Sequence, residues 1–199
     1  MTTAFFVPKE PCKPRPIIQA FLYAFAVSLL SGAFAAHATT TLSERKLLNY
    51  KDSYGNVDLR NARNIPLPDP LLVNGNLNLS QSHLTRLPQR LTVKGNLNLA
   101  YSKITQLPSQ LVVEGYINLA HSNIQYLNNG LQVNGDLSLM GTQLTELPPY
   151  LYVAGNLYLA NTAITELPEY LMVGGHIYLG GASINKFPEQ LNVGGNIYR

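Results

Sequence analysis

The 199-residue chain contains a single cysteine, Cys12, which precedes an apolar run near the amino terminus. The rest of the sequence therefore has no disulfide framework, no thiolate metal site and no cysteine nucleophile. Charge is scarce too, since charged residues make up 13% of the chain and the formal charge is +3. Lys9, Lys13 and Arg15 against Glu10 contribute +2 of that charge. The remaining +1 excludes the strongly basic surface that nucleic-acid binding requires.

The segment over residues 1–38 has the features of a targeting sequence. Lys13 and Arg15 precede an uncharged run over residues 17–36, which leads into Ala36-His37-Ala38, a small-x-small pattern. We expect a secretory signal peptide over residues 1–38, cleaved after Ala38. The run is about 20 residues long, so an uncleaved anchor in the inner membrane is the alternative. Cleavage would give a secreted or periplasmic protein without stable membrane insertion.

The sequence is rich in copies of a twenty-residue unit. The copy over residues 91–110 is LTVKGNLNLAYSKITQLPSQ. Leucine opens each copy, at Leu71, Leu91, Leu111, Leu131, Leu151, Leu171 and Leu191, and glycine follows at Gly75, Gly95, Gly115, Gly135, Gly155, Gly175 and Gly195. Such a short fixed period is typical of a solenoid, in which each unit buries its apolar face by stacking on its neighbours.

The residues of one unit predict its path. Leu97-Asn98-Leu99 alternates with the period of a strand that has one buried face, and Leu91-Thr92-Val93 is a second, shorter alternation. Gly95 lies at a sharp bend, where glycine would tolerate a positive φ. Pro108 disfavours a helix at the end of the unit. The sequence therefore predicts an all-β solenoid, a stack of about seven twenty-residue coils.

The region before the regular copies predicts a cap and a first coil. Within residues 39–54, Leu42, Leu47 and Leu48 lie among charged residues, which favours a short amphipathic helix over the end of the stack. Residues 55–70 match the repeat in degenerate form, so the solenoid is expected to cover residues 55–199.

One polar position in each copy is expected to point inward. It holds Ser82, Ser102, Ser122, Thr142, Thr162 and finally Ala182. Because a buried hydroxyl needs a partner, we expect these side chains to bond backbone groups at the turn of their own or the next coil.

The segment from Leu97 to Pro108, LxLxxSxIxxLP, resembles the leucine-rich repeats of the shortest bacterial class. That class occurs in type III secretion effectors of enteric bacteria and in related phage-type repeat proteins. The resemblance covers about residues 55–199 and implies a leucine-rich-repeat solenoid, but no particular function. Effectors that are ubiquitin ligases carry a catalytic domain after their repeats, and this sequence ends at Arg199.

Histidines and carboxylates do not align into a catalytic or metal-binding set. His83, His121 and His176 occupy different places in the repeat, which favours solvated surface positions over a stacked metal site. Glu146 and Glu166 are in phase, but no histidine shares that phase, so a solvated ladder is favoured over acid/base chemistry. We therefore expect a protein that is not an enzyme and needs no metal and no cofactor.

The outward row of the main strand is the candidate binding surface. Its first asparagines are Asn76, Asn78, Asn96 and Asn98. They either stabilise the stack by bonding one another or contact a ligand. The candidate binding residues are Tyr116, Asn118, Asp136, Ser138, Asn156, Tyr158, His176 and Tyr178. Tyrosine gives contact area at low entropic cost and asparagine gives adaptable hydrogen bonds, which suits a protein or a carbohydrate ligand.

Three functions remain open on the sequence alone. The favoured one is a non-catalytic, exported protein-binding or scaffold module. The others are the targeting half of an effector-type enzyme without its catalytic domain, and a structural or remnant repeat protein with no ligand. A second outward row is apolar and is either a contact strip or an effect of strand propensity: Leu72, Val112, Tyr152 and Met172.

Two irregularities add expectations about the stack. In residues 127–130, Leu-Asn-Asn-Gly replaces Leu-Pro-x-x, so this turn should be the loosest. The sequence stops on a strand, which leaves the last coil uncapped, and charge is uneven. Residues 42–110 carry nine Lys/Arg against four Asp/Glu, and residues 111–199 carry two against six. Self-association through the last coil into a homo-oligomer is therefore a further expectation.

Overall fold

The computed structural model describes residues 42–63, 65–189 and 191–199. The chain divides into two units, Met1–Thr39 and Thr40–Arg199, and all described residues belong to the second. The signal peptide or anchor expected over residues 1–38 lies outside them. Within the described ranges, no helix is both long enough and apolar enough to cross a membrane.

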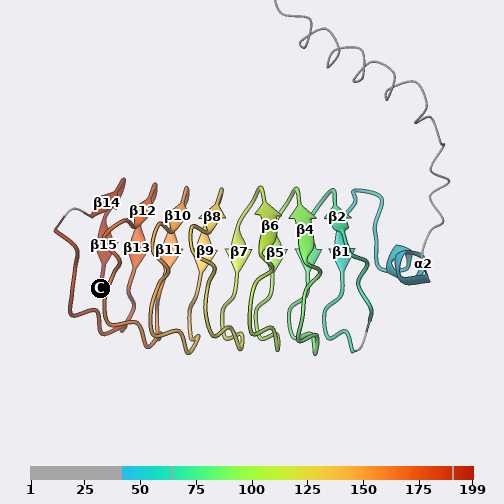
Figure 1. Ribbon diagram of the computed structural model, residues 1–199, viewed down its shortest axis with the longest axis horizontal. Helices are drawn as coiled ribbons and strands as arrows, with labels where there is room; N and C mark the ends of the chain where they lie inside the picture. The colour runs from blue at the N-terminus through green and yellow to red at the C-terminus, as the bar shows by residue number, and fades with distance from the viewer. Residues whose placement is uncertain (1–41, 64, 190) are drawn as a thin grey trace, which may run out of the picture. The chain divides into compact units, whose positions relative to one another are not determined.

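The second unit is a parallel β-solenoid whose coils follow the period of the sequence repeat (Figure 1). One strand from each coil joins an eight-stranded parallel sheet in coil order. Its strands are β1 (Val57–Asp58), β3 (Leu77–Asn78), β5 (Leu97–Asn98), β7 (Ile117–Asn118), β9 (Leu137–Ser138), β11 (Leu157–Tyr158), β13 (Ile177–Tyr178) and β15 (Ile197–Tyr198). Residues one repeat apart pair directly, as Leu77 does with Leu97. The prediction of an all-β stack of coils is confirmed.

A second short strand in the coils forms two smaller parallel sheets. The first consists of β2 (Leu71–Val73), β4 (Arg90–Val93) and β6 (Gln110–Val113), and the second of β8 (Gln132–Val133), β10 (Tyr152–Val153), β12 (Met172–Val173) and β14 (Asn192–Val193). The path of the chain changes between them. Gly130 has a φ of 67°, and the Leu131 amide donates to the Asn128 carbonyl at 3.2 Å. In earlier coils the place of Gly130 is taken by Arg90 and Gln110. Both of these residues already belong to a strand.

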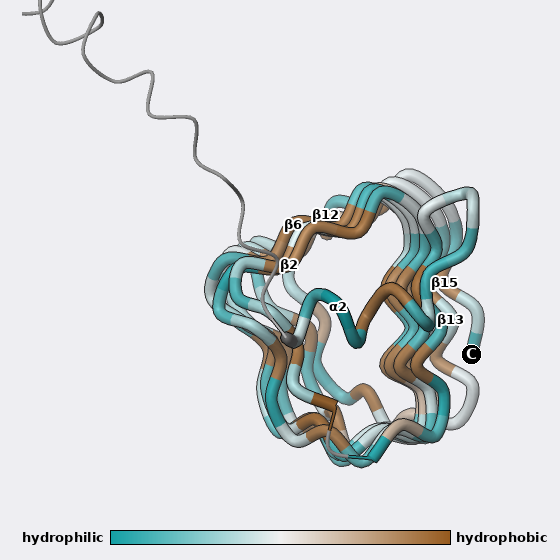
Figure 2. The backbone as a smooth tube through the Cα atoms, turned by 90° about the vertical axis from the view of Figure 1, so that its right-hand side faces the viewer, coloured by the Kyte–Doolittle hydropathy of each residue, from teal (hydrophilic) through white to brown (hydrophobic). Residues whose placement is uncertain are grey.

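The core is a column of aliphatic side chains, and Figure 2 looks along it with the coils superimposed. Leu91, Val93, Leu97, Leu99 and Ile104 of one coil have no exposed surface. Burying a side chain of this size is worth about 1.5–3 kcal/mol. Ordering the residues of a whole coil costs more than one coil recovers, so the stack gains stability only as coils add to each other.

The amino-terminal edge of the stack is covered. Helix α2 (Leu42–Leu48) places Leu47 in the core, as the amphipathic pattern predicts. After the helix, Lys51 forms an antiparallel bridge with Val57, and the Asp58 amide donates to the Tyr50 carbonyl at 2.9 Å. The first main strand therefore has a hydrogen-bonded neighbour on both sides. Figure 2 shows α2 lying across this end of the coils.

The glycine column lets the coils approach closely. The expectation of a positive φ at Gly95 is wrong, because within this column only Gly55 has one. A Cβ added to Gly95 would instead lie 2.5 Å from the Asn76 Oδ1 atom and 2.8 Å from the Gly75 carbonyl carbon. The Gly95 amide also donates to the Gly75 carbonyl at 3.0 Å. Glycine is needed here because the backbone of the preceding coil occupies the space of a side chain.

The inward polar column behaves differently at serine and at threonine. The Oγ1 atoms of Thr142 and Thr162 donate to the carbonyls of Leu139 and Leu159, at 2.7 and 2.8 Å. The same expectation is wrong for Ser82, Ser102 and Ser122, whose buried hydroxyls have no partner among the described residues. A β-branched threonine has fewer χ1 choices, which favours the rotamer that reaches this carbonyl.

The last coil is less well covered than those before it. Leu179 is buried and its amide donates to the Tyr198 carbonyl at 2.7 Å. Ile184, Leu191 and Val193 are only half-buried. The sequence predicts at most a partial coil above Leu179, Ile184, Leu191 and Val193. The exposure of the last three agrees with this, whereas Leu179 is nevertheless buried.

Candidate binding surface

All eight predicted binding residues lie on the outer side of the eight-stranded sheet, in two adjacent rows. The row immediately before the strands holds Tyr116, Asp136, Asn156 and His176. The row at the second residue of the strands holds Asn118, Ser138, Tyr158 and Tyr178. Tyr116 is exposed and the other seven are half-buried. In-register pairing thus places the members of each row one coil apart on a single face.

The row before the strands is a hydrogen-bonded ladder between coils. The Asn76 Oδ1 atom accepts from the Asn96 backbone N–H at 2.8 Å, and the Asn156 Oδ1 atom accepts from the His176 N–H at 2.8 Å. His176 continues the ladder through Nδ1, which accepts from the Asn196 N–H at 2.8 Å. Asparagine side chains in this row therefore bond backbone amides of the next coil. Asn76 bonds Asn96 in this way, as the stabilising interpretation predicts, whereas Asn78 and Asn98 bond residues of their own turns. A neutral His176 carries its proton on Nε2, because Nδ1 is an acceptor.

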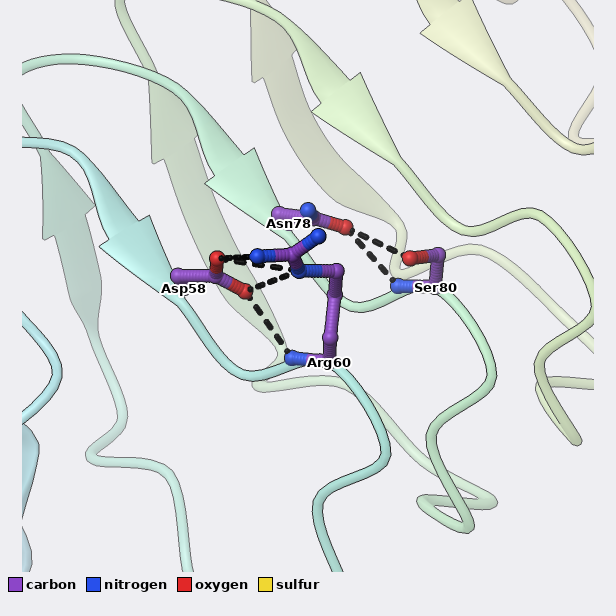
Figure 3. Close-up of polar contacts among 4 residues, drawn as sticks. All are labelled: Asp58, Arg60, Asn78 and Ser80. Carbon is purple, nitrogen blue, oxygen red and sulfur yellow. Dashed lines mark hydrogen bonds and ion pairs between the residues drawn. The ribbon is translucent and has the colours of Figure 1, made fainter.

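The row at the strand ends begins with a turn motif. The Asn78 Oδ1 atom accepts from the Ser80 N–H at 3.1 Å and from its hydroxyl at 2.8 Å (Figure 3). Asp58 accepts from the Arg60 N–H at 3.1 Å and pairs with its guanidinium at 2.8 Å. Burial raises the pKa of Asp58, but the hydrogen bonds and charge of Arg60 outweigh this and hold that pKa below its ordinary value. Asn118 makes the same turn as Asn78, so its carbonyl oxygen is already engaged.

Toward the carboxyl end the same row becomes a stack of tyrosine rings. The rings of Tyr158 and Tyr178 have centroids 4.8 Å apart and are 5° from parallel. Tyr198 extends the stack at 5.1 Å from Tyr178. Sequence reasoning missed Tyr198, although its place one full repeat after Tyr178 was a sufficient signal. Both faces of the Tyr178 ring are covered, so the stack presents ring edges and hydroxyl groups to a ligand.

Charged and aromatic neighbours surround the tyrosine stack. The His176 ring lies 6.1 Å from Tyr178 and 5.4 Å from Tyr198, centroid to centroid. Burial raises the pKa of the Tyr158 phenol, and the nearby Asp136 carboxylate and Tyr178 raise it further. The Asp136 Oδ1 atom also accepts from the Asn156 N–H at 2.7 Å, which fixes its position beside the stack.

Tyr116 interrupts the ladder. Its N–H donates to the Asn96 Oδ1 atom at 3.0 Å, but its phenol side chain offers no oxygen to the Asp136 N–H. Among the described residues, the amide-to-carbonyl bond of the glycine column is also missing between Gly135 and Gly115. The outer surface therefore divides at this point into an asparagine part and a tyrosine part.

The other residues considered from the sequence lie apart from this surface. His83 is exposed, and the exposed His121 ring stacks on Tyr101 at 4.8 Å. Glu166 pairs with Lys186 at 3.2 Å, so it is neither isolated nor part of a carboxylate pair. In the described part of the chain, no group of three His, Cys, Asp or Glu side chains is placed to hold a metal ion.

A groove that the sequence did not suggest follows the proline corner of the last coils. Its volume is about 1070 Å³. Leu147, Leu167, Leu171, Met172 and Phe187 are among the apolar residues that line it, together with the stacked rings of Tyr150 and Tyr170. Its carboxylates are Glu146, Glu166, Glu169 and Glu189. The in-phase glutamates and tyrosines were the available signal.

Comparison with protein-family models, with curated proteins and with solved structures found no match to this chain. The class defined by the fold is therefore a parallel β-solenoid with short coils.

Proposed function

We propose that the chain is a non-catalytic, exported binding or scaffold module that contacts a protein through the tyrosine part of its eight-stranded sheet. The observation that carries this proposal is the three-ring stack of Tyr158, Tyr178 and Tyr198 beside His176. Tyrosine and histidine present apolar edges with polar tips, a combination suited to protein interfaces. The proposal includes membership of the short leucine-rich-repeat class, supported by the motif over residues 97–108.

The stack favours a protein ligand over a carbohydrate. Sugars bind aromatic residues by lying on the face of a ring, whereas both faces of Tyr178 are covered by its neighbours. A protein can use what remains, because its polar groups can bond the hydroxyls and its side chains can pack against the ring edges. The ladder through Asn156 and His176 holds this surface in place before binding, which lowers the entropic cost of association.

Export is supported by the leader sequence. Lys13 and Arg15, the apolar run over residues 17–36 and the Ala36-His37-Ala38 pattern are the features of a cleaved signal. Amino-terminal sequencing of the protein from fractionated bacterial cells tests this part. We expect the mature chain to begin at Thr39 in the secreted or periplasmic fraction. Recovery of a chain that begins at Met1 in the membrane fraction would support the anchor instead.

The binding surface can be tested by removing hydroxyl groups without removing rings. A tagged full chain is expressed, cross-linked in cells and purified, and the captured proteins are quantified by mass spectrometry. The variant Tyr158→Phe/Tyr178→Phe keeps the stack and loses two hydroxyls. We expect it to lose at least about tenfold of the specifically captured protein, since each hydrogen bond contributes about 1 kcal/mol.

The matched control is Tyr54→Phe/Tyr101→Phe, which removes two hydroxyls from exposed tyrosines outside the eight-stranded sheet. We expect this variant to capture the same proteins as the unmodified chain. Equal capture by all three chains would reject the tyrosine part as the contact surface. No specific capture by any of them would favour a structural protein without a ligand.

A further inference from the structure

The two smaller sheets and the proline corner form a second surface, here called the lateral face. Its apolar members are the outward row Leu72, Val112, Tyr152 and Met172 and the corner tyrosines Tyr150 and Tyr170. Leu72 is 58% exposed, Val112 is 52% exposed and Met172 is 43% exposed. Side chains of this size that remain accessible along one side of a stack indicate a contact surface rather than a solvated one. The tyrosine stack of the main sheet is not part of it.

The corner and the outward row meet on one surface in the last coils. In the carboxyl-terminal coils, Glu146, Tyr150, Glu166, Tyr170 and Met172 all line the same groove. Three repeats before Glu146 and Tyr150 stand Arg86 and Arg90, at the same corner of earlier coils, because the main sheet keeps all coils in register. Asp69 lies there too, since its carboxylate accepts from the Gln89 and Arg90 N–H groups at 2.9 and 3.2 Å. The lateral face therefore runs from two arginines and one carboxylate at one end to several carboxylates at the other.

The charges at the two ends are mostly unused within the chain. Among the described residues, neither Arg86 nor Arg90 forms an ion pair. At the acidic end, Lys186 pairs with Glu166 at 3.2 Å, whereas Glu146, Glu169 and Glu189 have no cationic partner within the described ranges. A surface with exposed apolar side chains along its length, an excess of arginine at one end and of carboxylates at the other is complementary to a second copy in the opposite direction.

We infer that two copies of this chain associate through their lateral faces, with the stacks antiparallel. In that arrangement Arg86 of each copy faces Glu146 of the other, and Arg90 faces Tyr150. A parallel arrangement would oppose arginine to arginine and carboxylate to carboxylate, which is strongly unfavourable. The antiparallel contact has two-fold symmetry, so it closes on itself and ends at a dimer.

The fixed spacing of the repeat determines which coil of one copy faces which coil of the other. In the main sheet all coils are one strand spacing apart, so a two-fold axis midway between the coils of Val112 and Gln132 matches the six coils from Leu72 to Met172 with those of the partner. Leu72 of one copy then meets Met172 of the other, near the groove formed by Tyr170. Thr92 meets Tyr152, and Val112 meets Gln132. The largest exposed aliphatic side chain at the basic end thus reaches the apolar lining at the acidic end.

The test uses two differently tagged full chains that are co-expressed and captured in a mild detergent, so that residues 1–41 are the same in all samples. Unmodified chains should capture one another, and salt of about 0.5 M should weaken this because it shortens the screening length to a few ångström. Arg86→Glu and Glu146→Lys should each lose self-capture at least about tenfold, because each change affects two symmetry-related contacts. When the two variants are mixed, capture should return, because each supplies the charge that the other has lost.

Two controls separate this contact from others. Lys103→Glu makes a comparable charge change at an exposed residue away from the lateral face and should leave capture unchanged. Val112→Asp places a carboxylate at the centre of the face and should abolish capture without altering the end coils.

The inference is overturned if unmodified chains do not capture one another, or if capture survives both charge reversals or the Val112 variant. Survival in these variants would instead point to contact through the end coils or residues 1–41. Failure of the mixed variants to recover would also reject the antiparallel arrangement. None of these outcomes depends on the tyrosine part of the main sheet.

Discussion

The coils before Tyr116 and those after it share one core and one main sheet, but they differ in most of their polar detail. The earlier coils have serine in the inward column and asparagine on the outer face, with Arg86 and Arg90 at the corner. In the later coils Thr142 and Thr162 follow Ser122 in the inward column, and tyrosine and glutamate appear on the outer face and at the corner. Backbone pairing is the same in both. Glycine and aliphatic residues thus determine the stack in both regions, whereas the polar positions differ and give each region its own surface.

The two regions meet at a junction between residues 111–116 and 131–136. The main sheet crosses it, since Ile117 pairs with Leu137, but the second sheet and the outer ladder do not. The Asn128 side chain partly bridges the gap by donating from Nδ2 to the Pro108 carbonyl at 2.9 Å. The junction therefore has fewer connections between neighbouring coils than any regular step.

Substitutions in the glycine column should lower the stability equally in both regions, because the backbones of neighbouring coils touch in both. Gly95→Ala and Gly155→Ala each put a Cβ against the backbone of the preceding coil, so each is expected to cost about 3 kcal/mol of unfolding free energy. Gly130→Ala meets no atom within 4 Å and should cost only about 1 kcal/mol, because of its positive φ. Chemical denaturation measures all three. Unequal costs at Gly95 and Gly155 would break the equivalence.

The junction should be the first place where the folded chain opens. Limited proteolysis is expected to cut near Asn129 and Gly130, which are exposed, before it cuts other turns. The control is Ser109→Gly, which places a glycine in a turn between paired second strands. If that turn is cut as fast, the glycine rather than the interrupted sheet decides susceptibility. Cuts spread evenly over all turns would show that the junction is no weaker than the rest.

Substitutions in the inward polar column should have different effects on stability in the two regions. The threonine hydroxyls there are hydrogen-bonded, and the serine hydroxyls have no described partner. Thr142→Val removes a buried hydroxyl that donates to the Leu139 carbonyl at 2.7 Å. That carbonyl keeps the Thr142 N–H at 3.2 Å, so the change removes one hydrogen bond and should cost about 1 kcal/mol. Ser102→Ala removes a buried hydroxyl with no described partner and should change stability by no more than about 0.5 kcal/mol. Denaturant midpoints compare the two. Equal losses would mean that Ser102 finds a partner in solution.

The smallest expected effect concerns the tyrosine stack at high pH. The folded pKa of Tyr158 is above its ordinary value of 10.0, so the unfolded chain loses this proton first as pH rises. Stability should therefore be unaffected below pH 10.0 and should fall as pH rises from there through the folded pKa. Tyr158→Phe keeps the ring and should lose less stability than the unmodified chain between about pH 9 and about pH 11. Identical pH dependence would argue against burial of this phenol.

Sequence periodicity was enough to predict the coils, their inward side chains and the cap at Leu47. It also placed the eight candidate binding residues on one face, because residues one repeat apart must stack in a solenoid. It failed where the outcome depends on the distance between two backbones or between two side chains. Gly95 was assigned to a turn conformation, although the close approach of Gly75 is what requires it.

The repeat by itself determined the architecture, because a chain with a short fixed period and alternating leucines buries its apolar face by stacking its coils. Tertiary structure decided how the polar groups are used. Only the registered stack shows that asparagine oxygens are occupied by amides of the next coil, that tyrosine rings cover each other's faces, and that four glutamates share one groove with Tyr150 and Tyr170. These properties depend on distances between coils, which periodicity implies, and on side-chain rotamers, which it does not.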